Sequence, residues 1–119
     1  MINHQSKSIL LVEDDKTTST LFTRRLENKG YTVYQAYKGD AVERMVIRYV
    51  PDCIILDIGL PVISGYDVFN MLKRFYQGPV IFHTDKNSDK VEVVCLKLGA
   101  DEFINKSTPF DVFYQRVNR

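Results

Sequence analysis

The sequence predicts an α/β fold of the doubly wound type, a three-layer sandwich with helices on both faces of a five-stranded parallel sheet. Two observations lead to this prediction. Short apolar runs, typical of buried parallel strands, alternate with longer segments of helical periodicity. The resulting order, a strand followed by a helix five times, needs right-handed crossovers, which place helices on both faces of one sheet.

The bulk composition is that of an ordinary globular domain. A length of 119 residues predicts a single domain over residues 1–119, either complete or part of a longer protein. The net charge of +1 argues against binding to nucleic acid or to a membrane surface as the main function. The first residues, MINHQSKS, lack the apolar core of a signal peptide, and no apolar run reaches the ~18 residues of a membrane span. We therefore expect a cytoplasmic protein.

Five segments predict the strands. Four are short continuous apolar runs, which suit central strands, and one alternates apolar and polar residues, which suits an edge. The continuous runs are Ile9–Val12, Cys53–Leu56, Val80–Phe82 and Phe103–Ile104, and the alternating segment is Tyr31–Ala36. The two cysteines, Cys53 and Cys95, lie within apolar segments and are expected to be buried free thiols.

Capping and stop residues predict where the helices begin and end. Side chains that accept a hydrogen bond from a free backbone N–H favour a helix start, and glycine or proline favours its end. The predicted starts are the capping pairs Asp40 with Glu43 and Ser64 with Asp67, a cap at Ser88, and a start near Pro109 or Phe110. The predicted stops are Gly30, Pro51 and Gly99.

Apolar residues at helical spacing predict the face that each helix turns toward the sheet. The predicted core-facing sets are Leu21, Phe22 and Leu26; Val42, Met45, Val46 and Tyr49; Val68, Met71, Leu72 and Phe75; and Val91, Val94, Cys95 and Leu98. With Val93 and Leu96 added, the fourth helix has more apolar residues than one buried face needs. Either some of them stay exposed for a partner, or the buried face is unusually wide.

Polar residues follow each central strand at the point where its apolar run ends. In an open parallel sheet, ligands bind beyond the carboxyl ends of the strands, so these residues are the candidate site. They are Glu13, Asp14 and Asp15 after the first run, Asp57 after Cys53–Leu56, Thr84 after Val80–Phe82, and Lys106 after Phe103–Ile104. Each is able to bind a metal, a phosphoryl oxygen or an anion.

Taken in order, four stretches of this sequence resemble the receiver domain of two-component response regulators. They are ILLVEDD, DCIILDIGLPVISGYD, HTD and LGADEFINK. The resemblance covers nearly the whole chain and implies a flavodoxin-like sheet of strand order 2-1-3-4-5. That order makes Glu13, Asp14 and Asp57 neighbours. Periodicity alone does not decide which two of residues 13–15 face the site. The family pattern favours Glu13 and Asp14, with Asp15 as a solvated residue at the helix start.

The resemblance also implies a Mg²⁺ site. Converging carboxylates repel one another, and a hard divalent ion with oxygen ligands relieves that repulsion. By resemblance, Asp14 and Asp57 bind Mg²⁺ directly, and Glu13 acts largely through water. The backbone carbonyl of Gly59 is the other implied ligand.

The implied function is a signalling switch rather than an enzyme in the usual sense, although it catalyses its own phosphorylation and dephosphorylation. Asp57 accepts a phosphoryl group from a sensor histidine kinase or phosphotransfer protein, while Lys106 and Thr84 bind the phosphoryl oxygens. Thr84 and the aromatic residue Phe103 then act as the switch. The expected output surface is the fourth helix, fifth strand and fifth helix, which would bind a downstream protein or a second copy.

Two positions depart from the usual family pattern. Asp85 replaces a small residue after Thr84, and Ser107 replaces the proline, often preceded by a cis bond, that generally follows the lysine. They keep open an alternative, a degenerate receiver that acts as an interaction module independent of phosphorylation. A phosphatase with an Asp nucleophile is disfavoured because Gly59 stands where such enzymes commonly have a second acid. His83 is expected to serve in packing, because alternation turns it away from Thr84.

Overall fold

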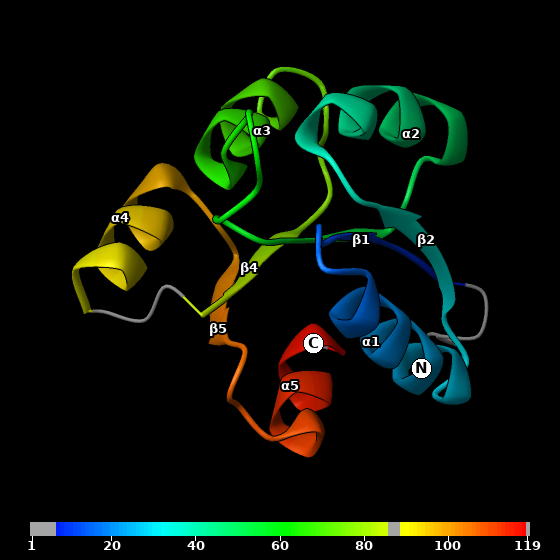
Figure 1. Cartoon of the computed structure of the whole chain (residues 1–119). Coiled ribbons are helices and arrows are strands. Elements are labelled where there is room, and N and C mark those ends of the chain that lie inside the picture. The colour runs from blue at the N-terminus through cyan, green and yellow to red at the C-terminus, as the bar shows by residue number, and fades with distance from the viewer. Residues whose placement is uncertain (1–6, 86–88, 119) are drawn as a thin grey trace.

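The computed structural model describes residues 7–85 and 89–118, and in it five parallel strands form one sheet between two layers of helices (Figure 1). The strand order is β2-β1-β3-β4-β5, and every neighbouring pair is parallel. The predicted fold class and strand order are therefore confirmed. The strands are β1 (Ser8–Val12), β2 (Thr32–Ala36), β3 (Cys53–Leu56), β4 (Val80–Thr84) and β5 (Glu102–Asn105).

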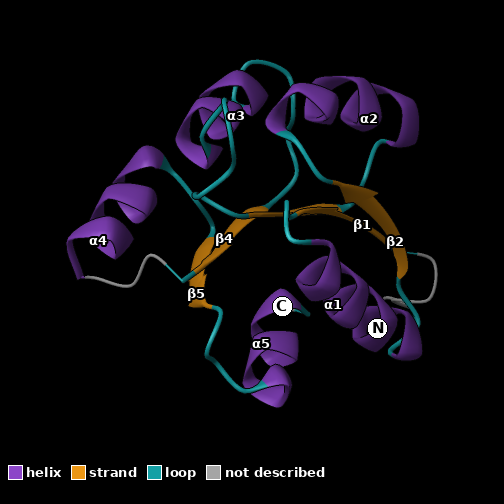
Figure 2. Ribbon diagram, viewed as in Figure 1, coloured by secondary structure: helices purple, strands orange, loops and turns teal. Residues whose placement is uncertain are grey.

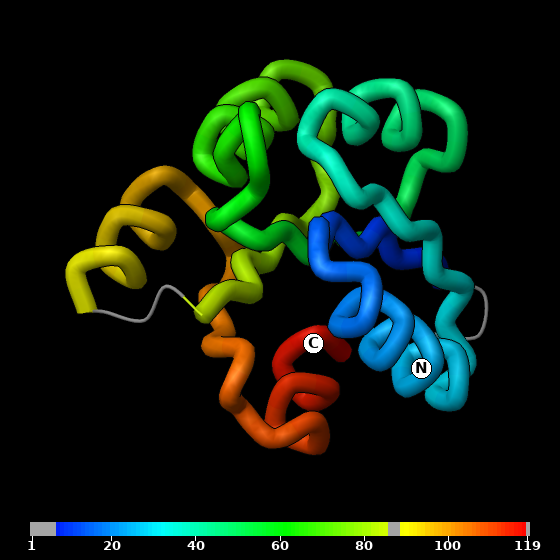
Figure 3. Tube along the Cα trace, viewed as in Figure 1, coloured from blue at the N-terminus to red at the C-terminus, as the bar shows by residue number. Residues whose placement is uncertain are grey.

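The helices divide between the two faces of the sheet. Figure 2 shows α1 and α5 on one face and α2, α3 and α4 on the other. In Figure 3, α1 and α5 lie side by side although they come from opposite ends of the chain, and the rings of Phe22 and Phe113 are 5.1 Å apart. The helices are α1 (Lys16–Asn28), the short 3₁₀ helix η2 (Gly39–Ala41), α2 (Val42–Tyr49), α3 (Gly65–Leu72), α4 (Asp89–Leu98) and α5 (Phe110–Val117).

The core has two halves, one on each face of the sheet. Alternate residues of one strand enter different halves: Ile54 packs toward α2, α3 and α4, whereas Ile55 packs toward α1 and α5. This two-sided burial explains the continuous apolar runs of β1, β3 and β4. The run Phe103–Ile104, interpreted as a central strand, belongs to β5, which is instead an edge strand. Cys53 and Cys95 are buried and free, as predicted, and burial raises the pKa of the Cys53 thiol to about 12.

Most of the predicted helix ends are confirmed. The Ser64 hydroxyl accepts a hydrogen bond from the Asp67 backbone N–H at 3.3 Å, and α5 begins directly after Pro109. Gly30 and Gly99 adopt positive φ just beyond α1 and α4, and this conformation favours glycine at a helix stop. The predicted cap at Ser88 lies outside the described residues.

One predicted start is wrong. Asp40 and Glu43 do not form a capping pair, because η2 runs directly into α2 at Ala41 and neither helix has a side-chain cap. Because η2 leads directly into α2, backbone carbonyls of η2 can replace a side-chain cap: the Val42 backbone N–H donates to the Gly39 carbonyl. The helix ends at Tyr49, two residues before the predicted stop at Pro51.

Some residues predicted to face the core are instead exposed. The buried stripe of α1 consists of Ser19, Phe22, Thr23 and Leu26, which places Leu21 outside it, 46% exposed. Phe75 is exposed because α3 ends at Leu72, so helical spacing no longer applies to it. Tyr49 and Val94 are also exposed. Val93 and Leu96 of α4 are exposed as well, which confirms that its apolar surface exceeds one buried face.

Candidate functional site

The candidate site lies at the carboxyl ends of the strands. Glu13 and Asp57 directly follow β1 and β3, Thr84 ends β4, and Lys106 directly follows β5. The Asp57 backbone N–H bonds to the Val12 carbonyl at 3.1 Å, so the ends of these two central strands are level. The sheet itself therefore brings together residues that are far apart in the sequence.

Glu13, Asp14 and Asp57 form an acidic cluster in which one carboxylate oxygen from each lies within 4.8 Å of the others. Glu13 and Asp57 are only 2% and 4% exposed, whereas Asp14 is open to solvent. Burial raises the pKa of Glu13, although hydrogen bonding to Lys106 opposes the rise. Three converging oxygen donors, one of them reachable from solvent, fit a hard divalent cation such as Mg²⁺.

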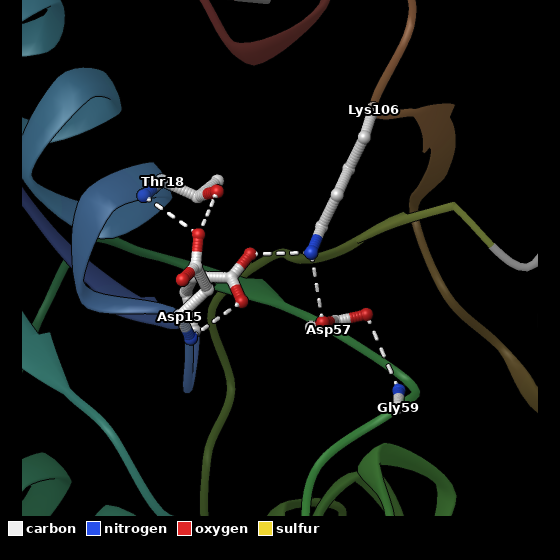
Figure 4. A network of polar contacts seen from close by, with 6 residues as sticks. Asp15, Thr18, Asp57, Gly59 and Lys106 are labelled. Carbon is white, nitrogen blue, oxygen red and sulfur yellow. Dashed lines mark hydrogen bonds and ion pairs between the residues drawn. The ribbon is translucent and has the colours of Figure 1, made fainter.

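Asp15 is not part of the acidic cluster. Its carboxylate caps α1 by accepting hydrogen bonds from the Thr18 backbone N–H at 3.0 Å and from the Thr18 hydroxyl (Figure 4). Asp15 is exposed, and these bonds lower the pKa of its carboxyl group. The structure thus decides the choice that periodicity left open: Asp14 joins Glu13 at the site, and Asp15 begins the helix.

Lys106 pairs with two carboxylates at once. Its Nζ lies 2.5 Å from Glu13 Oε1 and 2.9 Å from Asp57 Oδ2, and Figure 4 shows its side chain extended toward Asp57. Burial alone lowers the pKa of Lys106, but hydrogen bonds to Glu13 and Asp57 outweigh that effect and raise it. The ammonium is therefore charged at neutral pH. Sequence reasoning placed Lys106 at the site but did not foresee its pairing with Glu13.

The Asp57 carboxylate is oriented by both of its oxygens. Oδ2 accepts from Lys106, and Oδ1 accepts from the Gly59 backbone N–H at 3.2 Å. Gly59 is thus adjacent to Asp57 as expected, while a role for its carbonyl as a metal ligand stays a prediction. A carboxylate with these two partners has a defined direction, which a nucleophile needs.

The remaining predicted residues lie in and around β4 and β5. Thr84 is fully buried, and Phe103, 6% exposed, is the register partner of Phe82 within the core. Asp85 is exposed just beyond β4. His83 is 3% exposed, with ring centroids of Phe22 and Phe113 at 4.8 and 4.7 Å, which confirms its packing role.

Sequence reasoning missed the importance of Gly65, the first residue of α3. A Cβ atom added there would lie 2.1 Å from the Asp57 carbonyl oxygen, and the Gly65 N–H donates to the Ile58 carbonyl at 2.9 Å. The start of α3 therefore packs directly on the backbone of the candidate nucleophile. A glycine directly after the predicted cap Ser64, at a helical position where its propensity is poor, was the signal that could have revealed this contact.

Gly65→Ala should destabilise the protein by about 1–3 kcal/mol, the usual range for overpacking a core. The new methyl group meets backbone rather than a flexible side chain, so the chain around Asp57 has to shift. Urea unfolding checks this result. Asn70→Ala, an exposed position of the same helix, is the matched control and should change stability by less than ~0.5 kcal/mol. Equal stability of the two variants would contradict the close contact.

Comparison with known proteins gives a consistent result. Residues 9–118 match the response regulator receiver domain family. Among solved structures, the BeF₃-activated N-terminal receiver domain of RstA from Klebsiella pneumoniae is 33% identical with a TM-score of 0.91, over 94% of this chain and 96% of that one. The non-phosphorylated HemR receiver domain from Leptospira biflexa is 31% identical with a TM-score of 0.87, over 96% and 93%.

A third similar structure is the signal receiver domain of a putative Luxo repressor protein from Vibrio parahaemolyticus. It is 27% identical with a TM-score of 0.88, over 94% of this chain and 87% of that one.

Within the described ranges, no helix has both the length and the apolar character to span a bilayer. With the family matched over residues 9–118, the chain belongs to the response regulator receiver domains of two-component signalling systems.

Proposed function

We propose that this receiver domain accepts a phosphoryl group on Asp57 from the phosphohistidine of a sensor histidine kinase or a phosphotransfer protein. The observation that carries the proposal is the environment of Asp57. It is a buried carboxylate at the end of β3, paired with the Lys106 ammonium and within reach of the Glu13 and Asp14 carboxylates. Such a site combines a directed nucleophile with charges suited to a phosphoryl group.

In the proposed reaction, an Asp57 carboxylate oxygen attacks phosphorus. The new O–P bond forms as the P–N bond to the donor histidine breaks, and the histidine ring leaves with the bonding electron pair. Lys106 offers its ammonium to a phosphoryl oxygen, while Thr84 offers its hydroxyl. Glu13, Asp14, Asp57 and the Gly59 carbonyl would hold Mg²⁺, which would supply positive charge to offset the negative charge of the phosphoryl oxygens.

Mass spectrometry after incubation with acetyl phosphate tests this function. Wild-type protein should gain one phosphate in the presence of Mg²⁺ and none with a chelator. Asp14→Ala should need far more Mg²⁺, because it loses one of three clustered carboxylates. The matched control is Asp15→Asn, which removes the neighbouring charge but keeps a capping side chain and should behave like wild type. Equal Mg²⁺ requirements for the two variants would exclude the proposed metal site.

Lys106→Ala should separate metal binding from phosphorylation. Removal of the ammonium takes away the partner of Glu13 and Asp57 but no metal ligand, so Mg²⁺ affinity should rise about thirtyfold. That change corresponds to the ~2 kcal/mol by which a divalent ion and a unit positive charge ~4 Å apart repel in water. Phosphorylation should become slow, because the site then lacks the Lys106 ammonium that would face the phosphoryl oxygens. Calorimetric titration with Mg²⁺ and the acetyl phosphate assay check both parts, and wild-type behaviour in both would refute the role of Lys106.

We further propose that phosphorylation changes a partner-binding surface on α4, β5 and α5. Exposed apolar side chains on α4 and α5 support this location, because large apolar surface in water favours association. They are Val93, Val94, Leu96 and Val112. The phosphoryl group offers the Thr84 hydroxyl a new acceptor, and movement of Thr84 would alter the packing around Phe103. The occupant is a downstream protein or a second copy of this chain.

Amide exchange with and without beryllofluoride, a mimic of the phosphoryl group, tests the proposed coupling. Protection should change around Thr84, along Val91–Leu98 and at Phe103, as expected for a shift between two populations. Changes confined to the neighbourhood of Asp57 would refute the coupling. If the protein bound its partner equally with and without beryllofluoride, the interaction module independent of phosphorylation would be the better description.

A further inference from the structure

A hydrogen-bonded turn directly follows β5 and has Lys106 as its second residue. The Thr108 backbone N–H donates to the Asn105 carbonyl at 3.0 Å, which closes a four-residue turn. The Asn105 side chain adds two bonds, because its Oδ1 accepts from the Ser107 backbone N–H at 2.8 Å and from the Ser107 hydroxyl at 2.7 Å. One side-chain oxygen therefore ties together both residues that flank Lys106.

The position of this turn determines whether the Lys106 ammonium can reach Glu13 and Asp57. Its long side chain crosses from the turn to Glu13 and Asp57, and a lysine side chain loses up to ~2 kcal/mol of rotamer entropy when it is held in place. The Lys106 backbone N–H is bound to the Thr84 carbonyl at 3.0 Å, which anchors the residue on the strand side. Asn105 provides the anchor on the loop side. The bond from Ser107 N–H is one that a proline at position 107, lacking this donor, could not make.

We propose that Asn105 is a positioning residue for Lys106: its side-chain oxygen holds the turn that directs the Lys106 ammonium into the acidic cluster. The inference rests on the proposed function insofar as Lys106 acts on the phosphoryl group. Its geometric basis is independent of that function. Among the described residues, the Asn105 side chain makes no hydrogen bond or ion pair with Glu13, Asp14 or Asp57, so this side chain acts on the acidic cluster through the turn that carries Lys106.

Because Lys106 pairs with two carboxylates, a loss of its position should change Mg²⁺ affinity and phosphorylation rate in opposite directions. The ammonium offsets part of the negative charge of Glu13 and Asp57, two of the three carboxylates that would bind Mg²⁺. A loosened Lys106 leaves these charges less neutralised, so Mg²⁺ should bind more tightly, while phosphorylation should slow. General damage to the site would instead weaken Mg²⁺ binding and also slow phosphorylation.

The experiment compares three variants with wild type in the intact chain. Asn105→Ala removes the side-chain acceptor, Asn105→Ser restores an uncharged oxygen that makes similar but weaker turns, and Ser107→Ala removes only the hydroxyl donor. Calorimetry with Mg²⁺ alone measures metal affinity, and mass spectrometry measures the rate of labelling by acetyl phosphate. For Asn105→Ala, the loss of two hydrogen bonds should slow labelling about fivefold and lower the Mg²⁺ dissociation constant about twofold.

The other variants should follow in order. Asn105→Ser and Ser107→Ala should lie between Asn105→Ala and wild type in both measurements. The proposal is overturned if Asn105→Ala matches wild type in both, if it weakens Mg²⁺ binding, or if Asn105→Ser is no better than Asn105→Ala. If wild-type protein takes up no phosphate at all, the proposed function fails, and the Mg²⁺ titrations by themselves still decide the role of Asn105.

Discussion

Asp57→Asn should gain no phosphate from acetyl phosphate under conditions in which wild-type protein gains one. The amide replaces a carboxylate oxygen that would attack phosphorus, and a neutral amide is a far weaker nucleophile. Asparagine has nearly the same shape, and Lys106 keeps its ion pair with Glu13, so the site should stay folded. Intact mass and peptide mapping measure the gain and its position.

A second carboxylate provides the control for this experiment. Asp67 is exposed in the first turn of α3, and Asp67→Asn should be phosphorylated like wild type. Thermal unfolding of both variants would show whether each remains folded. Labelling of Asp57→Asn at the wild-type level would show that Asp57 is not the acceptor, whereas loss of labelling in both variants would point to an effect of charge rather than of the nucleophile.

Acidification should destabilise the protein through His83. Burial against the rings of Phe22 and Phe113 lowers the pKa of His83 from 6.5 to about 4, because the charged imidazolium is poorly solvated there. The unfolded chain therefore binds a proton between pH 6.5 and pH 4 that the folded protein does not. The stability from neutral His83 is complete above pH 6.5, falls as the pH drops, and is lost near pH 4.

The size of this effect follows from the pKa difference. At 1.36 kcal/mol for each pKa unit, a fall from 6.5 to about 4 amounts to roughly 3 kcal/mol. Urea unfolding at several pH values measures it, with His83→Leu as the reference protein that cannot take up this proton. The quantity compared is the slope of unfolding free energy against pH in the two proteins. The contribution of the carboxylates cancels in this comparison, because both proteins contain them. Parallel slopes between pH 6.5 and pH 4 would contradict a buried neutral His83.

Much of the fold could be predicted from the sequence because its signals are local. Five strands, the central ones as continuous apolar runs, follow from burial on one or both faces of a sheet. The cap at Ser64 and the stops at Gly30 and Gly99 depend on residues within one turn of the helix, so they too are legible in the sequence. The strand order came from the family resemblance, since periodicity does not say which strands pair.

The errors arose where a residue's environment is made by distant segments. Leu21 is more apolar than Ser19 or Thr23, yet only the latter two fall on the buried stripe of α1. The pattern of hydrophobicity does not indicate where the helix meets the sheet, and here the line of contact contains small polar residues. The prediction that Phe75 faces the core was wrong for a different reason: no glycine or proline marks the end of α3 at Leu72.

The succession of strands and helices, and the polar residues that follow the strands, are legible in the residues alone. Periodicity left open whether Asp14 or Asp15 faces the site, and the family pattern favoured Asp14; in the folded chain Asp14 joins the acidic cluster and Asp15 caps α1. The sharing of Lys106 between Glu13 and Asp57, and the contact of Gly65 with the Asp57 carbonyl, appear only in the folded chain. The difference comes from distance along the chain. A cap or a buried stripe depends on neighbours within a few residues, whereas these contacts exist only once parallel strands bring separate loops to one edge of the sheet.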